Sequence, residues 1–146
     1  MESSDAIRVV FDTNVLAAAV RSRRGASFAL ISSIPAPEFL PCLSVTLYAE
    51  WQDVLTRPEN LPPGTSRQDA LTFLRYLASQ SHLQEIHFLW RPQLPDADDD
   101  MVLELAVAGG CQYIISHNVR DFRGSEQLGV VAITPREFLK LIRKSS

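Results

Sequence analysis

Acidic side chains occur at four separate points of the chain, and together they could supply oxygen ligands for a divalent cation. Asp12 directly follows an apolar run, and Glu50 lies at the border of the apolar face of an expected helix. A dense acidic run spans 96–100, and a polar segment spans 116–122. Carboxylates without cysteine or histidine partners suit hard ions such as Mg²⁺ or Mn²⁺ rather than zinc. Such ions orient a phosphodiester and lower the pKa of a bound water.

The acidic run holds more carboxylates than a helix start requires, because one or two satisfy the helix dipole and further ones repel each other. Asp96 is the expected cap. Asp99 precedes apolar residues at helical spacings, so we expect it over the inner face of the helix. Asp100 aligns with Glu104 and is expected to face solvent. Asp99 is therefore the preferred ligand, and Asp98 is the nearest alternative.

Each acidic point also has an ordinary structural interpretation. Asp12 could cap the next helix, Glu50 could be a solvated edge residue, and the segment Ser116-His117-Asn118-Val119-Arg120-Asp121-Phe122 could be a polar turn. These interpretations would require four unrelated polar sites to fall at one end of one sheet by accident. His117 lies near the expected site but has no partner at a suitable spacing, so it is left out of the catalytic set.

The elements that must position these residues alternate between strand-like and helix-like segments. This alternation predicts a three-layer α/β/α fold with a mainly parallel sheet, whose active sites form at the carboxyl ends of the strands. Strands are expected at 7–11, 85–88, 112–116 and 130–133, and helices are expected from 15, at 26–33, from the Ser44 cap to about 56, at 66–81, from 96 to 108 and from 134.

Composition favours a single domain over residues 1–146, with an apolar fraction of 46% and a net charge of −3. That charge argues against a protein that holds nucleic acid by bulk positive field alone. The polar start predicts no secretory signal, and no apolar run reaches membrane-spanning length, so we expect a cytoplasmic protein. Cys42 and Cys111 each stand alone in the sequence and are expected to be reduced and buried.

Four motifs resemble the PIN-domain family when they are taken in order: Phe11-Asp12-Thr13-Asn14, Glu50, Asp98-Asp99-Asp100 with residues 105–110, and residues 116–122. Their order and spacing are similar to the VapC-like toxin ribonucleases of bacterial toxin–antitoxin systems, over nearly the whole chain. The resemblance implies a parallel sheet between helices, one or two Mg²⁺ or Mn²⁺ ions, and hydrolysis of RNA by a metal-activated water.

By position, the resemblance implies that Asp12, Glu50 and Asp99 hold the metal and that Thr13, Asn14 and Ser116 support them. Many members carry an aspartate where this chain has Asn118, while others share the asparagine and keep an acid three residues later, as Asp121 does here. Asn118 and Asp121 therefore complete the candidate catalytic set. An asparagine carbonyl can still ligate a hard ion.

The leading hypothesis is a metal-dependent endoribonuclease that acts as the toxin of a type II module, with an RNA substrate, a cognate antitoxin protein and a homodimeric state. The alternative is a catalytically weak or inactive PIN domain that serves as a binding or regulatory module. A phosphoacceptor signalling domain is disfavoured, because such domains carry a lysine just after the last strand, whereas here Ile133 is followed by Thr134-Pro135-Arg136. Phosphate contacts require local basic groups, for which the candidates are Arg21, Arg23, Arg24, Arg120 and Arg123.

Overall fold

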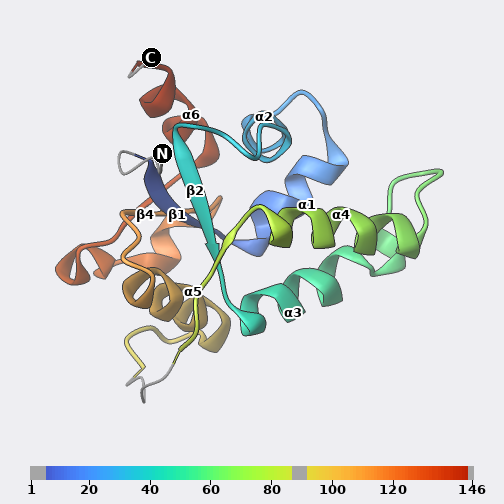
Figure 1. The fold of residues 1–146 in the computed structure, drawn as a ribbon. Coiled ribbons are helices and arrows are strands. Elements are labelled where there is room, and N and C mark those ends of the chain that lie inside the picture. Colours follow the sequence, from blue (N-terminus) through green and yellow to red (C-terminus); the bar gives the residue numbers. More distant parts are fainter. Residues whose placement is uncertain (1–5, 87–91, 145–146) are drawn as a thin grey trace.

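The computed structural model describes residues 6–86 and 92–144, and its central feature is one five-stranded parallel sheet (Figure 1). The strand order is β3-β2-β1-β4-β5. All four neighbouring pairs are parallel, which confirms the predicted α/β class. The strands are β1 (Ile7–Phe11), β2 (Phe39–Leu43), β3 (His82–Leu83), β4 (Tyr113–Ile115) and β5 (Val131–Ile133).

Helices cover both faces of this sheet. Helix α5 (Ala97–Ala108) packs on β1, β2 and β4, while α2 (Ala26–Ser32) packs against α1 (Thr13–Arg21) and α6 (Pro135–Lys144) on the other face. Helices α3 (Val45–Leu55) and α4 (Arg67–Ser79) form a pair that extends to the right of the sheet in Figure 1. Three short 3₁₀ helices complete the described elements: η1 (Pro58–Asn60), η2 (Val119–Phe122) and η3 (Ser125–Leu128).

Three of the predicted helix starts are confirmed by their caps. Ser44 accepts a hydrogen bond from the Leu47 N–H, and Ser66 forms a reciprocal capping box with Asp69. Asp96 accepts from the N–H groups of two following residues, which confirms it as the cap of α5. Side-chain oxygen atoms thus satisfy amide donors that have no partner inside their own helix.

The strand predicted at 85–88 was wrong. The structure places β3 at His82–Leu83, where sequence reasoning expected a helix end, and Glu85 and Ile86 lie outside any strand; residues 87 and 88 lie outside the described residues. The physical reason is the length of its partner. Strand β3 pairs only with the last two residues of β2, Cys42 and Leu43, because β2 ends there and Ser44 begins α3.

Cys42 and Cys111 are buried and free of disulfide bonds, as predicted, but they do not stand apart. A Cβ placed on Gly109 would lie 3.3 Å from the Cys111 sulfur and 3.6 Å from the Cys42 sulfur. A hydrogen bond with Cys111 lowers the pKa of the Cys42 thiol, and the nearby Arg8 guanidinium adds to the effect. The two thiols therefore lie next to each other, between the sheet and the end of α5.

The strand order creates a topological switch point at the carboxyl end of β1, because strands later in the chain lie on both sides of it. Strand β2 lies on one side of β1, and β4 lies on the other. The carboxyl ends of β1 and β4 are joined by a hydrogen bond of 3.0 Å from the Asp12 N–H to the Ile115 carbonyl. Ligand sites of parallel α/β sheets form at such a point. No helix in residues 6–86 and 92–144 is long and apolar enough to cross a membrane.

Candidate active site

Asp12 is the centre of a hydrogen-bonded group at this switch point. It caps α1 by accepting from the Thr13 N–H at 2.8 Å, and its Oδ2 accepts from the Ser116 hydroxyl at 2.8 Å and from the Asn14 amide at 3.3 Å. The Asn14 amide also donates to the Ser116 hydroxyl oxygen at 3.2 Å. The cap interpretation and the site interpretation of Asp12 therefore hold together, since one carboxylate oxygen caps the helix and the other receives the two polar side chains.

Burial raises the pKa of Asp12, although the hydrogen bonds from Ser116 and from the Thr13 N–H oppose that effect. The charges of Asp121 and Asp96 raise the pKa further. The negative charge of a carboxylate is unfavourable when the group is buried from water and lies beside other carboxylates, and a bound cation would offset this cost. Asp12 thus has the environment expected of a cation ligand.

Glu50 reaches this group from α3. The Thr13 hydroxyl donates to its Oε2, so the residue directly after Asp12 fixes the Glu50 carboxylate. Burial raises the pKa of Glu50, the Thr13 hydrogen bond opposes it, and the neighbouring Asp98 charge raises it again. Glu50 is half-buried rather than solvated, which agrees with its predicted place at the border of the apolar face.

Asp99 lies near the same centre, at the first turn of α5. Burial raises its pKa to about 6, and the charges of Asp96, Asp12, Asp121 and Asp98 add to the shift. Four carboxylates, which come from α5 and its cap, the cap of α1 and η2, therefore act on a single residue. Asp98 is exposed but influences Glu50, so both aspartates that the sequence analysis weighed as ligands remain beside the site.

Asp100 does not face solvent, so that expectation was wrong. It is buried, with 7% of its surface exposed, and its Oδ1 accepts from the backbone N–H groups of Gln93 and Leu94 at 2.8 and 3.1 Å. Helical spacing correctly placed it beside Glu104, whose pKa is raised by burial and further by the charge of Asp100. The spacing could not show that the chain leading into α5 folds over this side of the helix.

The segment after β4 brings its polar residues to the site with different degrees of contact. Ser116 is completely buried against Asp12, while Asn118 is exposed and donates its backbone N–H to the Ser116 hydroxyl oxygen at 3.0 Å. Asp121 is exposed, yet it is close enough to raise the pKa of both Asp12 and Asp99. The structure thus places all five candidate catalytic positions at one edge of the sheet.

Sequence reasoning missed a partner for His117. Its ring Nε2 lies 2.9 Å from the hydroxyl oxygen of Ser27, and its backbone N–H donates to the Asn14 side-chain oxygen at 3.1 Å. Ser27 lies in α2 and is only 3% exposed. A single serine in an apolar helix, 90 residues away in sequence, carries no signal that would identify it as a histidine partner.

The donor set fits a divalent cation in chemistry and charge. Among the interactions that shift the pKa values of Asp12, Glu50 and Asp99 in the described part of the chain, none comes from a lysine or arginine. Within the described residues, the neighbouring charges that shift these pKa values are therefore carboxylates. Within residues 6–86 and 92–144, however, no three Asp, Glu, His or Cys side chains are already arranged to hold one ion together.

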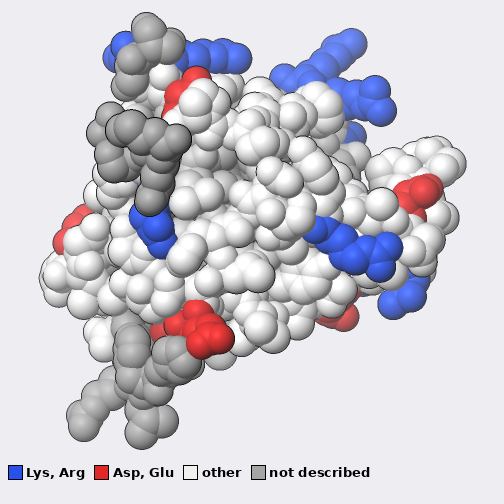
Figure 2. Space-filling model, in the orientation of Figure 1, with Lys and Arg blue, Asp and Glu red and all other residues white. Residues whose placement is uncertain are grey.

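The basic candidates fall into two groups. Arg120 and Arg123 line two hollows beside the acids, whereas the turn after α1, which carries Arg23 and Arg24, lies at the upper right of Figure 1, away from the start of α5. Figure 2 shows where the charged side chains lie on one face of the molecule. A group of acidic side chains lies near its lower edge, and several basic side chains extend from its upper edge.

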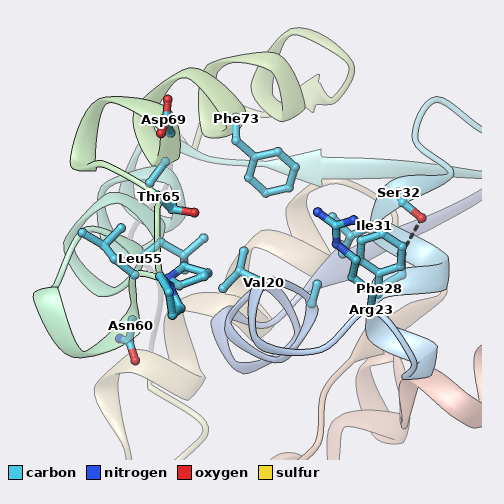
Figure 3. Close-up of a pocket in the computed structure, with 15 residues that line it drawn as sticks. Val20, Arg23, Phe28, Ile31, Ser32, Leu55, Asn60, Thr65, Asp69 and Phe73 are labelled. Atoms are coloured by element: carbon cyan, nitrogen blue, oxygen red, sulfur yellow. Dashed lines mark hydrogen bonds between the residues drawn. The ribbon is translucent and has the colours of Figure 1, made fainter.

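An apolar pocket of about 340 Å³ lies elsewhere, among α1, α2, the end of α3 and the start of α4 (Figure 3). Val20, Phe28 and Phe73 point into it, and Arg23 lies beside Phe28. None of the candidate metal ligands lines this pocket. It is therefore distinct from the acidic site at the carboxyl edge of the sheet.

Comparison with known proteins agrees with the observed fold. A sequence model of the PIN domain matches residues 8–120, which include Asp12, Glu50, Asp99 and Asn118. A search of curated proteins found no match to the chain. Asp121 lies one residue beyond the matched segment. Because the matched segment spans well over half of the sequence and runs from β1 into the start of η2, the chain belongs to the PIN-domain family, whose members are generally nucleases.

Proposed function

We propose that this PIN domain is an Mg²⁺- or Mn²⁺-dependent endoribonuclease that hydrolyses RNA phosphodiester bonds and serves as the toxin of a type II toxin–antitoxin module. The observation that carries the nuclease proposal is that Asp12, Glu50 and Asp99 lie around the switch point, where burial and neighbouring carboxylates raise all three pKa values. The toxin role rests on the resemblance of the four motifs to VapC-like ribonucleases, and the cytoplasmic location is proposed from the composition of the sequence.

In this proposal Asp12, Glu50 and Asp99 would hold the metal, which when bound supplies an activated water and neutralises charge that develops on the phosphate. The protein's part is orientation. The Ser116 hydroxyl and Asn14 amide direct the Asp12 carboxylate, and the Thr13 hydroxyl directs the Glu50 carboxylate. Such supporting hydrogen bonds fix the positions of ligands and tune their basicity.

A second candidate function is a PIN domain that binds RNA or a regulatory partner with weak or no cleavage. Two observations favour it. No three acidic side chains in the described residues are arranged to hold one ion, and Asn118 stands where many members carry an aspartate. The two functions differ in one measurement. A binding module would bind single-stranded RNA in the presence of Mn²⁺ and leave it uncut.

Chelation is expected to abolish RNA cleavage, because the hydroxyl groups that contact the acids or a histidine, those of Thr13, Ser27 and Ser116, are buried away from a substrate phosphate. Purified protein should cut single-stranded RNA with Mn²⁺ or Mg²⁺, stop in excess EDTA and resume when Mn²⁺ is restored. An identically purified Asp12→Asn variant serves as the control for contaminating ribonucleases. Undiminished cleavage in EDTA by the wild type alone would refute the metal mechanism.

We further propose a homodimer that forms through helices, and an antitoxin protein as its partner. Apolar side chains of α2 and α4 that are only half-buried, such as Phe28 and Phe73, support the use of these helices in an interface. Light scattering is expected to give the mass of two chains, and Phe73→Asp should shift the population towards one chain. A single-chain mass for the wild type at every accessible concentration would contradict the dimer.

A further inference from the structure

The ring of His117 is held in place at the rim of the acidic site, and nothing in the proposed metal chemistry uses it. Its backbone is fixed by Asn14, which also donates to the Asp12 carboxylate, and its Nε2 is fixed by Ser27 of α2. The ring itself is exposed, whereas Ser27 is buried. A buried hydroxyl therefore orients an exposed imidazole, and the second ring nitrogen, Nδ1, has no hydrogen bond among the described residues.

His117 lines a hollow of about 670 Å³ together with Asn118, Arg120, Arg123 and Thr134. A second hollow of about 430 Å³ is lined by Asp96 and Asp99 at the start of α5, and it shares Arg120, Asp121 and Arg123 with the first. The two hollows thus adjoin each other along η2. A polymer that places one phosphate at the acids would extend into the hollow that His117 lines.

We propose that His117, Arg120 and Arg123 form a binding subsite for an RNA phosphate that flanks the one being cut. This inference rests on the proposed ribonuclease function. When the Ser27 hydroxyl donates to Nε2, the proton of the neutral imidazole lies on Nδ1, which can donate to a phosphate oxygen. The two guanidinium groups supply charge and further donors, since arginine suits phosphate geometry.

The charged residues that line the hollow of His117 together favour an anion. Asp121 is the acidic residue that lines the shared wall, and it also acts on Asp12 and Asp99. Two arginines outnumber it in the hollow of His117, and the other lining residues there are uncharged or histidine. Arg120, Asp121 and Arg123 line both hollows, so the acidic hollow differs in charge by the addition of Asp96 and Asp99, whereas the arginines are in excess in the hollow of His117.

Direct binding in EDTA tests this subsite without any cleavage. Anisotropy of a fluorescein-labelled, short single-stranded RNA should show that His117→Ala and Arg123→Gln each raise Kd by roughly 3- to 10-fold, the usual effect of one lost hydrogen bond or phosphate contact. Arg67→Gln, at the exposed start of α4, is the matched control. A surface substitution far from the subsite should change Kd by about twofold at most. Arg123→Gln should also lower the salt slope of log Kd by about 0.7.

A double-mutant cycle separates the orienting role of Ser27 from general damage. Ser27→Ala removes no charge and lies out of reach of RNA, so it should weaken binding only through the His117 ring, and it should have no further effect in a His117→Ala background. Melting temperatures of the variants verify that the fold is intact. Unchanged affinity in His117→Ala and Arg123→Gln, or no RNA binding by the wild type, would overturn the subsite.

The same experiments distinguish this inference from the proposed function. Variants that cleave RNA with Mn²⁺ and bind it as tightly as the wild type would refute the subsite and leave the ribonuclease intact. Loss of binding in the His117 and Arg123 variants of a protein that never cuts RNA would support the subsite and refute the nuclease. Retention of affinity by Ser27→Ala while His117→Ala loses it would refute the orienting contact.

Discussion

Asp99→Asn is expected to lower RNA cleavage by about 10²-fold or more while leaving the melting temperature nearly unchanged. The substitution removes one charge and almost no volume. Because burial and four neighbouring carboxylates raise the pKa of Asp99, loss of its charge relieves an unfavourable charge and should not unfold the protein. The activity loss follows if Asp99 holds the metal, since the neutral amide weakens the ion and its bound water together.

Two control substitutions make the test specific. Asp53→Asn removes an exposed carboxylate that pairs with Arg57, four residues later and just beyond the end of α3, and should leave activity within a few fold. Asp98→Asn addresses the alternative ligand, because Asp98 is exposed beside Glu50. Saturating Mn²⁺ and thermal melts in parallel are the measurements. A larger loss for Asp98→Asn than for Asp99→Asn would identify Asp98 as the ligand.

The parts of the fold that sequence reasoning anticipated are those set by local patterns. Ser44, Ser66 and Asp96 are caps in the structure because their side chains satisfy nearby amide donors, which is an interaction within a few residues. The parallel sheet followed from alternation of strands and helices. By contrast, β3 depends on how much of β2 is free to pair, and no pattern within residues 82–86 carries that information.

The candidate site divides in the same way. Asp12 and Ser116 could be placed together from sequence because each follows a strand, and parallel strands end at the same edge. Contacts between side chains of different elements could not be placed. The hydrogen bond between Thr13 and Glu50, and the contact between Ser27 and His117, depend on how α2 and α3 pack beside α1.

Asp100→Ala is expected to lower the free energy of unfolding by about 1.5–3 kcal/mol, the usual contribution of hydrogen bonds to a charged group. The buried carboxylate accepts from the N–H groups of Gln93 and Leu94, so its removal leaves both donors without that partner. For a chain of this size the change corresponds to a fall in Tm of roughly 5–10 °C. Differential scanning calorimetry of the purified variant measures both quantities.

Asp100→Asn and Asp53→Ala bracket this result. The asparagine keeps an acceptor oxygen but loses the charge, so its Tm should lie between those of the wild type and Asp100→Ala. Asp53→Ala removes an exposed i,i+4 ion pair and should cost at most about 0.5 kcal/mol. Equal melting temperatures for Asp100→Ala and the wild type would show that the carboxylate does not hold the segment before α5.

The adjacent residues Asp99 and Asp100 therefore separate function from stability within one helical turn. Both belong to the acidic run and both lie in the first turn of α5, where the dipole favours negative charge. Asp99 points towards other carboxylates, whereas Asp100 points towards the backbone of the chain that leads into the helix. If Asp99→Asn loses activity at an unchanged Tm and Asp100→Ala loses stability, the density of the acidic run is explained by two separate demands on neighbouring positions.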